Sequence, residues 1–328
     1  MPKYALMKNP AHTKVSFQDT NALAIKELAL FAPSATHIES TPIGGVPYIT
    51  FEAESLDATT ISRLSFVYAI FQITGETLTP IHLAPNHFID PELSSILKYQ
   101  GKTNELFTRL MLNIAHKYSA QEKLNILDPM AGKGTTLYEA LIHGHNAYGI
   151  EMDPKPVHEA VVYLKKYLET AKYKHTSHTE KISGMGTDGK FTSTRNTLAI
   201  GRNKEDDKRI FEILDGDARN AHFIFRKNYF DAIVADLPYG VQHGSKTAKK
   251  PTGKTITRNA LGLVTEAMPG WIKVLKPGGV VVLAWNLFLI TQEEMAQVFA
   301  KHGLKVQELN FDHKVDQAID RGLIVGIL

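Results

Sequence analysis

The stretch Leu124–Thr136, "LNILDPMAGKGTT", is the clearest indication of the fold class. A short apolar run ends in the acid Asp128, and two glycines, Gly132 and Gly134, follow before the helical pattern "TTLYEALIHG". A buried strand, a glycine turn and an amphipathic helix in this order are the start of a β–α–β unit. Glycines at the head of a helix also let the backbone approach a ligand closely.

The same alternation continues on both sides of this stretch. Upstream, "ELFTRLMLNIAHKY" predicts a helix over 105–118 with Thr103 or Asn104 as its cap. Further strands are predicted within 147–151, 210–217, 230–236 and 278–285, and further helices within 154–170, 258–275 and 291–303. Two last strands, in 304–312 and 321–328, have no helix between them, which predicts one antiparallel member. The fold class is therefore α/β, with a parallel-rich sheet covered on both faces.

The chain divides near residue 100. Residues 1–98 mix strand and helix patterns and predict a small α/β N-terminal domain, while 99–328 form the larger domain. Residues 171–208 interrupt the rhythm with Lys, Ser, Thr, Gly and His, which predicts a flexible insertion. An ordered metal site is the alternative, since His175 and His178 are three residues apart, but no second ligand pair accompanies them. We therefore expect no metal.

Composition excludes several classes of protein. The 328 residues contain no cysteine, so disulfides, thiolate metal sites and a cysteine nucleophile are excluded. No apolar run approaches the ~20 residues of a membrane helix, and no signal sequence is evident, so we expect a cytoplasmic protein without a membrane partner. Residues 1–100 hold six Lys/Arg and nine Asp/Glu, a net −3; with +3 overall, the remainder carries +6. That surplus fits either a phosphate-bearing partner or an ordinary solvated surface.

Acidic residues follow four of the predicted strands: Asp128, Glu151, the pair Asp215 and Asp217, and Asp236. Ligands of open α/β sheets bind beyond the carboxyl ends of the strands. A phosphate-binding P-loop needs Ser or Thr after its lysine, but Gly134 follows Lys133. A dinucleotide fingerprint needs a third glycine at position 137, which is Leu. S-adenosylmethionine carries a sulfonium, an ammonium and a ribose but no phosphate, so it suits an acidic crevice.

Together, "LDPMAGKGTT", "YGIEMD", "DGDAR" and "DLPYG" resemble a class I S-adenosylmethionine-dependent methyltransferase with a Rossmann-like sheet. More narrowly, with "YQGKTNELFTRLMLNIA", they resemble Trm11-type RNA methylases, relatives of the THUMP-containing guanine-N2 enzymes. The resemblance covers about 99–170 and 210–286. It implies S-adenosyl-L-methionine as the cofactor, with Glu151 on the ribose hydroxyls and Asp217 with Ala218 at the adenine. The full set of implied cofactor-binding residues is Thr103, Phe107, Asp128, Met130, Gly132, Gly134, Thr135, Glu151, Met152, Asp217, Ala218 and Asp236.

The motif Asp236–Gly240, "DLPYG", predicts the catalytic site. The exocyclic amine of a base is a poor nucleophile because its lone pair is delocalised, and acceptors on its N–H groups pull it toward sp³ geometry. Asp236 and a carbonyl of Leu237 or Pro238 suit this task, and Tyr239 offers a face for the base. We expect N-methylation, most specifically of guanosine N2 in tRNA.

The run 241–258 predicts the contact with nucleic acid. It contains no acid and five cations: Lys246, Lys249, Lys250, Lys254 and Arg258. A cationic loop beside a base pocket favours phosphate contacts, with a solvated loop as the alternative. RNA is the expected partner. A DNA methyltransferase acting on adenine-N6 or cytosine-N4 and a non-catalytic nucleic-acid-binding relative remain as alternatives. The sequence does not predict the oligomeric state.

Overall fold

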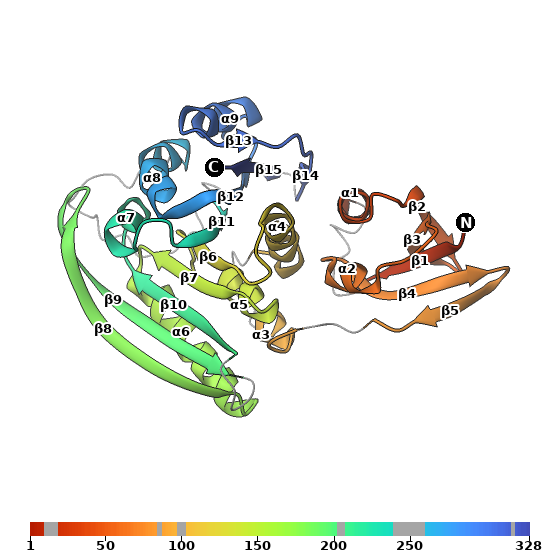
Figure 1. Cartoon of the computed structure of the whole chain (residues 1–328), viewed down its shortest axis with the longest axis horizontal. Helices are drawn as coiled ribbons and strands as arrows, with labels where there is room; N and C mark the ends of the chain where they lie inside the picture. The colour runs from red at the N-terminus through yellow and green to blue at the C-terminus, as the bar shows by residue number, and fades with distance from the viewer. Residues whose placement is uncertain (10–18, 84–86, 97–102, 202–206, 239–259, 316–318) are drawn as a thin grey trace, which may run out of the picture. The chain divides into compact units, whose positions relative to one another are not determined.

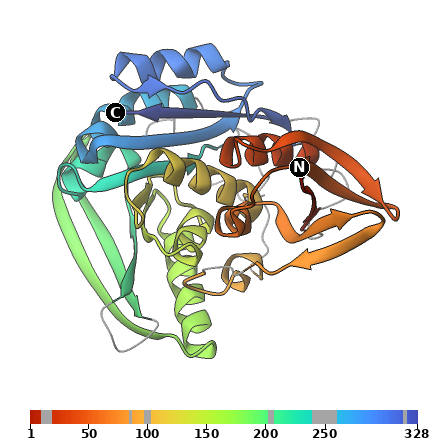
Figure 2. The same ribbon diagram turned by 45° about the vertical axis from the view of Figure 1, so that its right-hand side comes forward.

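The computed structural model describes residues 1–9, 19–83, 87–96, 103–201, 207–238, 260–315 and 319–328. The chain forms two compact units, Met1–Asn86 with Phe311–Arg321 and His87–Asn310 with Gly322–Leu328. Figure 1 labels their elements and Figure 2 shows the same ribbon turned.

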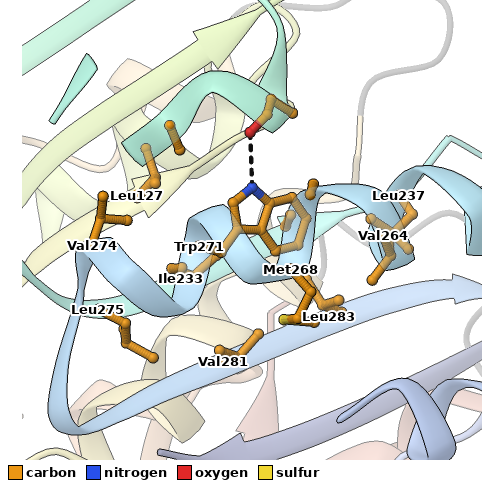
Figure 3. Close-up of a cluster of buried hydrophobic side chains, with 14 of the residues drawn as sticks. Leu127, Ile233, Leu237, Val264, Met268, Trp271, Val274, Leu275, Val281 and Leu283 are labelled. Carbon is orange, nitrogen blue, oxygen red and sulfur yellow. Dashed lines mark hydrogen bonds between the residues drawn. The ribbon is translucent and has the colours of Figure 1, made fainter. Parts of the chain in front are cut away.

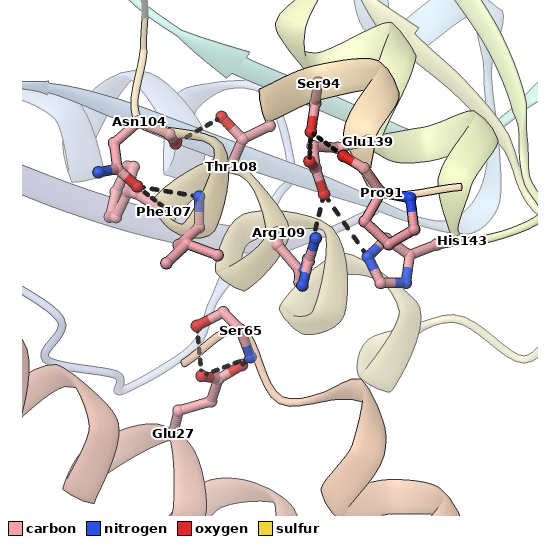
Figure 4. A network of polar contacts seen from close by, with 11 residues as sticks. Glu27, Ser65, Pro91, Ser94, Asn104, Phe107, Thr108, Arg109, Glu139 and His143 are labelled. Carbon is pink, nitrogen blue, oxygen red and sulfur yellow. Dashed lines mark hydrogen bonds and ion pairs between the residues drawn. The ribbon is translucent and has the colours of Figure 1, made fainter. Parts of the chain in front are cut away.

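The first unit is built on a five-stranded antiparallel sheet in the order β2-β3-β1-β4-β5. Its elements are β1 (Lys3–Lys8), α1 (Asp19–Phe31), β2 (Thr36–Ile43), β3 (Val46–Glu52), α2 (Ala58–Arg63), β4 (Val67–Thr74) and β5 (Thr77–Ile81). Leu6, Leu28 and Phe51 lie in its core at 0% exposure. The carboxylate of the buried Glu27 accepts hydrogen bonds from the backbone N–H and the hydroxyl of Ser65 (Figure 4). This joins α1 to the chain that follows α2.

The second unit is a sheet whose central strands are parallel. Its strand order is β13-β15-β12-β11-β6-β7-β10-β9-β8, and the pairs joining β12, β11, β6, β7 and β10 are all parallel. The strands are β6 (Asn125–Asp128), β7 (Asn146–Glu151), β8 (Lys174–Gly186), β9 (Gly189–Gly201), β10 (Lys208–Asp215), β11 (Phe230–Asp236), β12 (Leu275–Asn286), β13 (Lys305–Val306) and β15 (Asp320–Ile327). β15 pairs antiparallel with β13, which confirms the predicted antiparallel member, and the short β14 (His313–Lys314) pairs antiparallel with the start of β15.

Helices cover both faces of this sheet, as the α/β pattern predicts. They are α3 (Glu92–Ser95), α4 (Glu105–Tyr118), α5 (Thr135–Ile142), α6 (Pro154–Thr170), the 3₁₀ helix η2 (Ala218–Asn220), α7 (Ala221–Ile224), α8 (Ala260–Val274) and α9 (Gln292–Lys301). α4, α5 and α6 lie on one face, and α7, α8 and α9 lie on the other (Figures 1 and 2). On the second face, Trp271 of α8 is fully buried among apolar side chains of β6, β11 and β12 (Figure 3).

Local capping explains where the helices begin. Asn104 accepts from the N–H groups of Leu106 and Phe107 at the start of α4. Asp153 caps α6 ahead of Pro154, and Thr291 forms the predicted capping box with Glu294 at the start of α9. These side chains satisfy backbone donors that have no partner within the helix.

The prediction of a flexible insertion at 171–208 is wrong for the residues that the structure describes. β8 and β9 form an antiparallel hairpin of two 13-residue strands, paired from Lys174–Gly201 to Gly186–Gly189, which extends the sheet beyond β10. The side chains of β8 are mostly polar and mostly exposed, so the strand lacks the apolar alternation that would have indicated it. The missed signal is the turn: Thr187 and Asp188 stand between two glycines, and Gly189 has a φ of 109°.

Candidate active site

The acids that follow the parallel strands lie on one edge of the sheet. Asp128 ends β6, Glu151 ends β7, Asp215 ends β10 and Asp236 ends β11, and these are four adjacent strands. Asp215 pairs in register with Glu151. Parallel strands bring their carboxyl ends to the same edge, so the structure brings these predicted residues together.

The glycine loop between β6 and α5 turns tightly at this edge. Gly132 has a φ of 52° and Gly134 a φ of 89°, the left-handed region that glycine adopts without strain. Nothing lies within 4 Å of a Cβ placed on Gly132, so the backbone is open to a ligand there. The Glu151 carboxylate accepts from the Gly132 N–H at 2.9 Å and from the Asp153 N–H at 3.0 Å. Glu151 thus ties the glycine loop to the start of α6.

Asp128 is buried at the centre of the edge. It accepts hydrogen bonds from the Met130 N–H, at 3.0 Å, and from Thr136. Burial raises the pKa of Asp128 to about 7, against the effect of these hydrogen bonds, and the nearby acids Glu151 and Asp236 raise it further. A cation bound beside Asp128 would favour the ionised carboxylate and so lower this pKa again.

Other predicted cofactor residues have different surroundings. Phe107 and Thr135 are buried, at 5% and 6% exposure, while Met152 is exposed. Met130 is half-buried and packs against the apolar cluster that contains Trp271. Met152 follows Glu151 directly, so its exposed side chain can cover a ligand held at the end of β7.

The loop after β10 contains Asp217 and Ala218, which were predicted to meet the adenine. Asp217 caps η2 and accepts hydrogen bonds from the side chain of Arg219. The Ala218 carbonyl accepts from the indole N–H of Trp271 at 3.0 Å (Figure 3). Sequence reasoning missed both Arg219 and Trp271. Arg219 stands inside the quoted motif "DGDAR", whereas Trp271 lies in a helix pattern with no local sign of this contact.

Asp236 is held by a residue far away in sequence. The Thr103 hydroxyl, just before α4, donates to Asp236 Oδ2 at 2.9 Å. Leu237 is buried and its N–H donates to the Ala284 carbonyl of β12 at 2.8 Å, so the backbone of the motif is anchored to the sheet. Pro238 is exposed. Thr103 was predicted to bind the cofactor. Its hydroxyl contacts Asp236, the carboxylate that was predicted to orient the target amine.

The remaining predicted residues lie outside the described residues. They are Tyr239 of the motif and the five cations Lys246, Lys249, Lys250, Lys254 and Arg258. Within the described ranges no cluster of three or more His, Asp or Glu side chains could hold a metal ion. No helix among the residues that the structure describes is long and apolar enough to cross a membrane.

The edge fits S-adenosylmethionine by the chemistry of its groups. Carboxyl groups from β6 and β7 suit cationic groups and ribose hydroxyls, and the open glycine backbone at Gly132 leaves room beside them.

Comparisons with known proteins agree with this assignment. A family model described as UPF0020, RMKL-like methyltransferase domain, matches residues 97–277, more than half of the chain. No curated protein matches the sequence significantly.

Solved structures with similar folds include TrmN from Thermus thermophilus, at 15% identity and a TM-score of 0.43, covering 87% of this chain. The chain spans only 57% of the TrmN chain. A TehB-like S-adenosylmethionine-dependent methyltransferase from Corynebacterium glutamicum matches at 14% identity over 72% of this chain and 91% of that one, with a TM-score of 0.38. Fibrillarin from Methanococcus jannaschii matches at 16% identity over 64% and 67% of the two chains, with a TM-score of 0.35. At such low identities and scores, none of these likenesses decides the substrate.

Proposed function

Because the chain belongs to the UPF0020 family of RMKL-like methyltransferase domains, its reaction is S-adenosylmethionine-dependent methyl transfer, and we propose that the acceptor is the N2 amine of guanosine in tRNA. Asp236 carries the proposal. It ends β11 beside β6, whose glycine loop borders the proposed cofactor site, and its Oδ2 is fixed by Thr103. A carboxylate in this place can accept hydrogen bonds from the N–H groups of a target amine. It is less suited to a target atom that needs a hydrogen-bond donor.

Each part of the site has a separate task in this proposal. Asp128, the glycine loop and Glu151 bind the methionine and ribose groups, and Asp217 with Ala218 binds the adenine. The bound cofactor would supply an electrophilic methyl group. Asp236 and a carbonyl of Leu237 or Pro238 accept hydrogen bonds from the target amine and orient its lone pair. As the new N–C bond forms, the S–CH3 bond of the bound cofactor would break to leave S-adenosylhomocysteine, and Asp236 would accept the proton that the nitrogen loses.

Positioning and preorganised electrostatics account for most of the rate in such a site. Leu237 and Asp236 are attached to β12 and Thr103 by hydrogen bonds, so little reorganisation is needed when the base arrives. Tyr239 is the proposed stacking surface for the base, and the lysine-rich run 241–258 is the proposed contact with RNA phosphates. The sequence resemblance to Trm11-type methylases supports guanosine N2 as the target.

The test is a methylation assay with tRNA from cells that lack this protein, followed by mass spectrometry of the nucleosides. We expect N2-methylguanosine with the wild-type protein. Asp236→Asn keeps the shape but weakens the acceptor, so the rate should fall about 10²–10³-fold, or ~3–4 kcal/mol. The affinity for S-adenosylhomocysteine should stay near the wild-type value.

Asp207→Asn is the matched control, since Asp207 is an exposed carboxylate that pairs with Arg209 and lies just before the start of β10, away from the strand ends of the site. It should leave the rate unchanged. Normal turnover by Asp236→Asn, or a methyl group found on ribose or on a ring carbon, would contradict the proposal. Methyl groups on adenine-N6 or cytosine-N4 of DNA would establish the DNA alternative instead.

A further inference from the structure

The β8–β9 hairpin is attached to the loop that follows β10. The Thr194 N–H of β9 donates to Asp215 Oδ1 at 2.7 Å, and at the tip the Thr187 N–H donates to Asn220 Oδ1 at 2.9 Å. The tip also fits closely: a Cβ on Gly186 would lie 2.8 Å from the amide atoms of Asn220. The hairpin therefore contacts the proposed adenine loop by specific groups as well as by sheet pairing.

Arg219 connects the tip of the hairpin to Asp217. Its Nη2 lies 2.5 Å from an oxygen of Asp188, in the turn between β8 and β9, and 2.5 Å from Asp217 Oδ2. On the other side, Nη1 donates to Glu266 of α8 at 3.1 Å. The Arg219 side chain is 20% exposed. Its three ion pairs, with carboxylates from three separate segments, hold it in one place.

The orientation of Asp217 depends on this arginine. The carboxylate accepts from the Arg219 backbone N–H at 2.8 Å, from Nε at 3.1 and 2.9 Å, and from Nη2. The Nε–H group is shared between the two oxygens, so these four contacts come from three N–H groups. Three N–H groups occupy about three of the roughly four acceptor positions of a carboxylate. Among the described residues, this leaves Asp217 with capacity for about one more donor, and the exocyclic amine of adenine is a donor of that kind.

We propose that the tip of the hairpin positions the adenine end of the cofactor site: Asp188 holds Arg219, and Arg219 aims the remaining acceptor position of Asp217 at the adenine amine. Asp188 and Arg219 are positioning residues in this arrangement and touch no reacting atom. The inference rests on the proposed assignment of Asp217 to the adenine. It gives the hairpin a role in cofactor selection.

The test compares two ligands that differ only at the amine. S-adenosylhomocysteine has it, and S-inosylhomocysteine has a carbonyl oxygen in its place. In wild-type protein the first should bind more tightly, because the oxygen cannot donate to Asp217. Asp188→Asn keeps the size of the side chain and removes its charge. Since Asp188 is 63% exposed, we expect a loss of about two- to fivefold in S-adenosylhomocysteine affinity, with S-inosylhomocysteine affinity unchanged.

Asp207→Asn serves as the matched control here as well. It removes a similarly exposed carboxylate from an arginine, with side-chain exposures of 73% and 12% for Asp207 and Arg209, against 63% for Asp188. For Asp207→Asn the preference for the amine-bearing ligand should not change, and its kcat at saturating S-adenosylmethionine should match the wild type.

The possible failures are distinguishable. A merely structural role for the tip would weaken both ligands equally in Asp188→Asn, and this would overturn the inference, as would an unchanged preference. If the wild-type protein bound both ligands alike, the assignment of Asp217 to the adenine would be wrong, whatever Asp188 does. If it bound neither ligand, the proposed cofactor site itself would be wrong.

Discussion

Asp128 at the strand edge and Glu139 within α5 are both buried carboxyl groups, but their surroundings shift their pKa values in opposite directions. They are 3% and 0% exposed. Burial raises the pKa of Asp128 to about 7, and no cation of the described residues pairs with it. Burial would also raise the pKa of Glu139, but Arg109, His143 and Ser94 outweigh it and lower the value to about 2.

The geometry around Glu139 shows how the chain neutralises its own buried charge. Arg109 Nε of α4 lies 3.1 Å from Glu139 Oε2, His143 Nε2 lies 3.6 Å from the same oxygen, and the Ser94 hydroxyl donates to Oε1 (Figure 4). These contacts join α3 and α4 to α5. At Asp128 two hydrogen bonds offset only part of the cost of burial, in the place where we propose that a cationic ligand binds. This difference supports a structural role for Glu139 and the proposed ligand-binding role for Asp128.

Removing the cation beside Glu139 should produce the largest change in stability. Arg109→Met leaves a buried charge unpaired, which typically costs about 3–5 kcal/mol, measurable by urea unfolding at pH 7. Arg109→Met combined with Glu139→Gln should recover part of this loss. Because the folded pKa of Glu139, about 2, is below its usual 4.5, the carboxylate contributes stability above pH 4.5 and loses it as the pH falls toward 2. A loss below 1 kcal/mol in Arg109→Met would contradict the comparison.

Replacing Asp128 by a neutral residue should affect cofactor binding more than folding. Asp128→Asn retains an acceptor for the Met130 N–H but removes the carboxylate, so S-adenosylmethionine affinity should fall by about 1.5–3 kcal/mol. At pH 8, above the folded pKa, the variant should unfold at the same temperature as the wild type or higher, because the buried charge is gone. Calorimetric titration and thermal melting measure the two effects. A strongly destabilised variant would show that Asp128 is structural, like Glu139.

Cofactor affinity should depend on pH through Asp128. The raised pKa means that the carboxyl group is protonated below about pH 7 and has to lose that proton to bind a cation. Affinity for S-adenosylmethionine should therefore rise with pH, by at most about tenfold per unit, and level off above pH 7. Asp128→Asn should flatten this profile. The idea fails if the wild-type affinity is constant between pH 5.5 and 8.

An exposed ion pair should give the smallest effect. Lys133 of the glycine loop lies 2.6 Å from Glu159 of α6, with side chains 33% and 37% exposed. Solvent screens such a pair, so Glu159→Gln should change stability by no more than about 1 kcal/mol and leave cofactor affinity unchanged. Comparing the stability loss of this variant with that of Arg109→Met separates the effect of burying an ion pair from the effect of forming one. Equal losses in both would mean that burial is not the deciding factor.

Much of the fold could be predicted because its signals are local. The order of strands and helices around Asp128, the cap at Asn104 and the capping box at Thr291 each depend on neighbours within a few residues. The placement of acids after β6, β7, β10 and β11 is also local, and parallel pairing then brings them to one edge. The hairpin was missed because its polar composition hid a turn signal that was itself local.

The strand ends and the residue types at each one could therefore be inferred from the sequence alone. The distant side chains that fix these residues in place could be identified only from the folded chain. Thr103 reaches Asp236 across 133 positions, Arg109 reaches Glu139 across 30, and Arg219 reaches Asp188 across 31. These contacts depend on strand order and helix packing, which hydrophobic periodicity does not encode, because periodicity specifies which face of an element is buried and not which neighbour covers it.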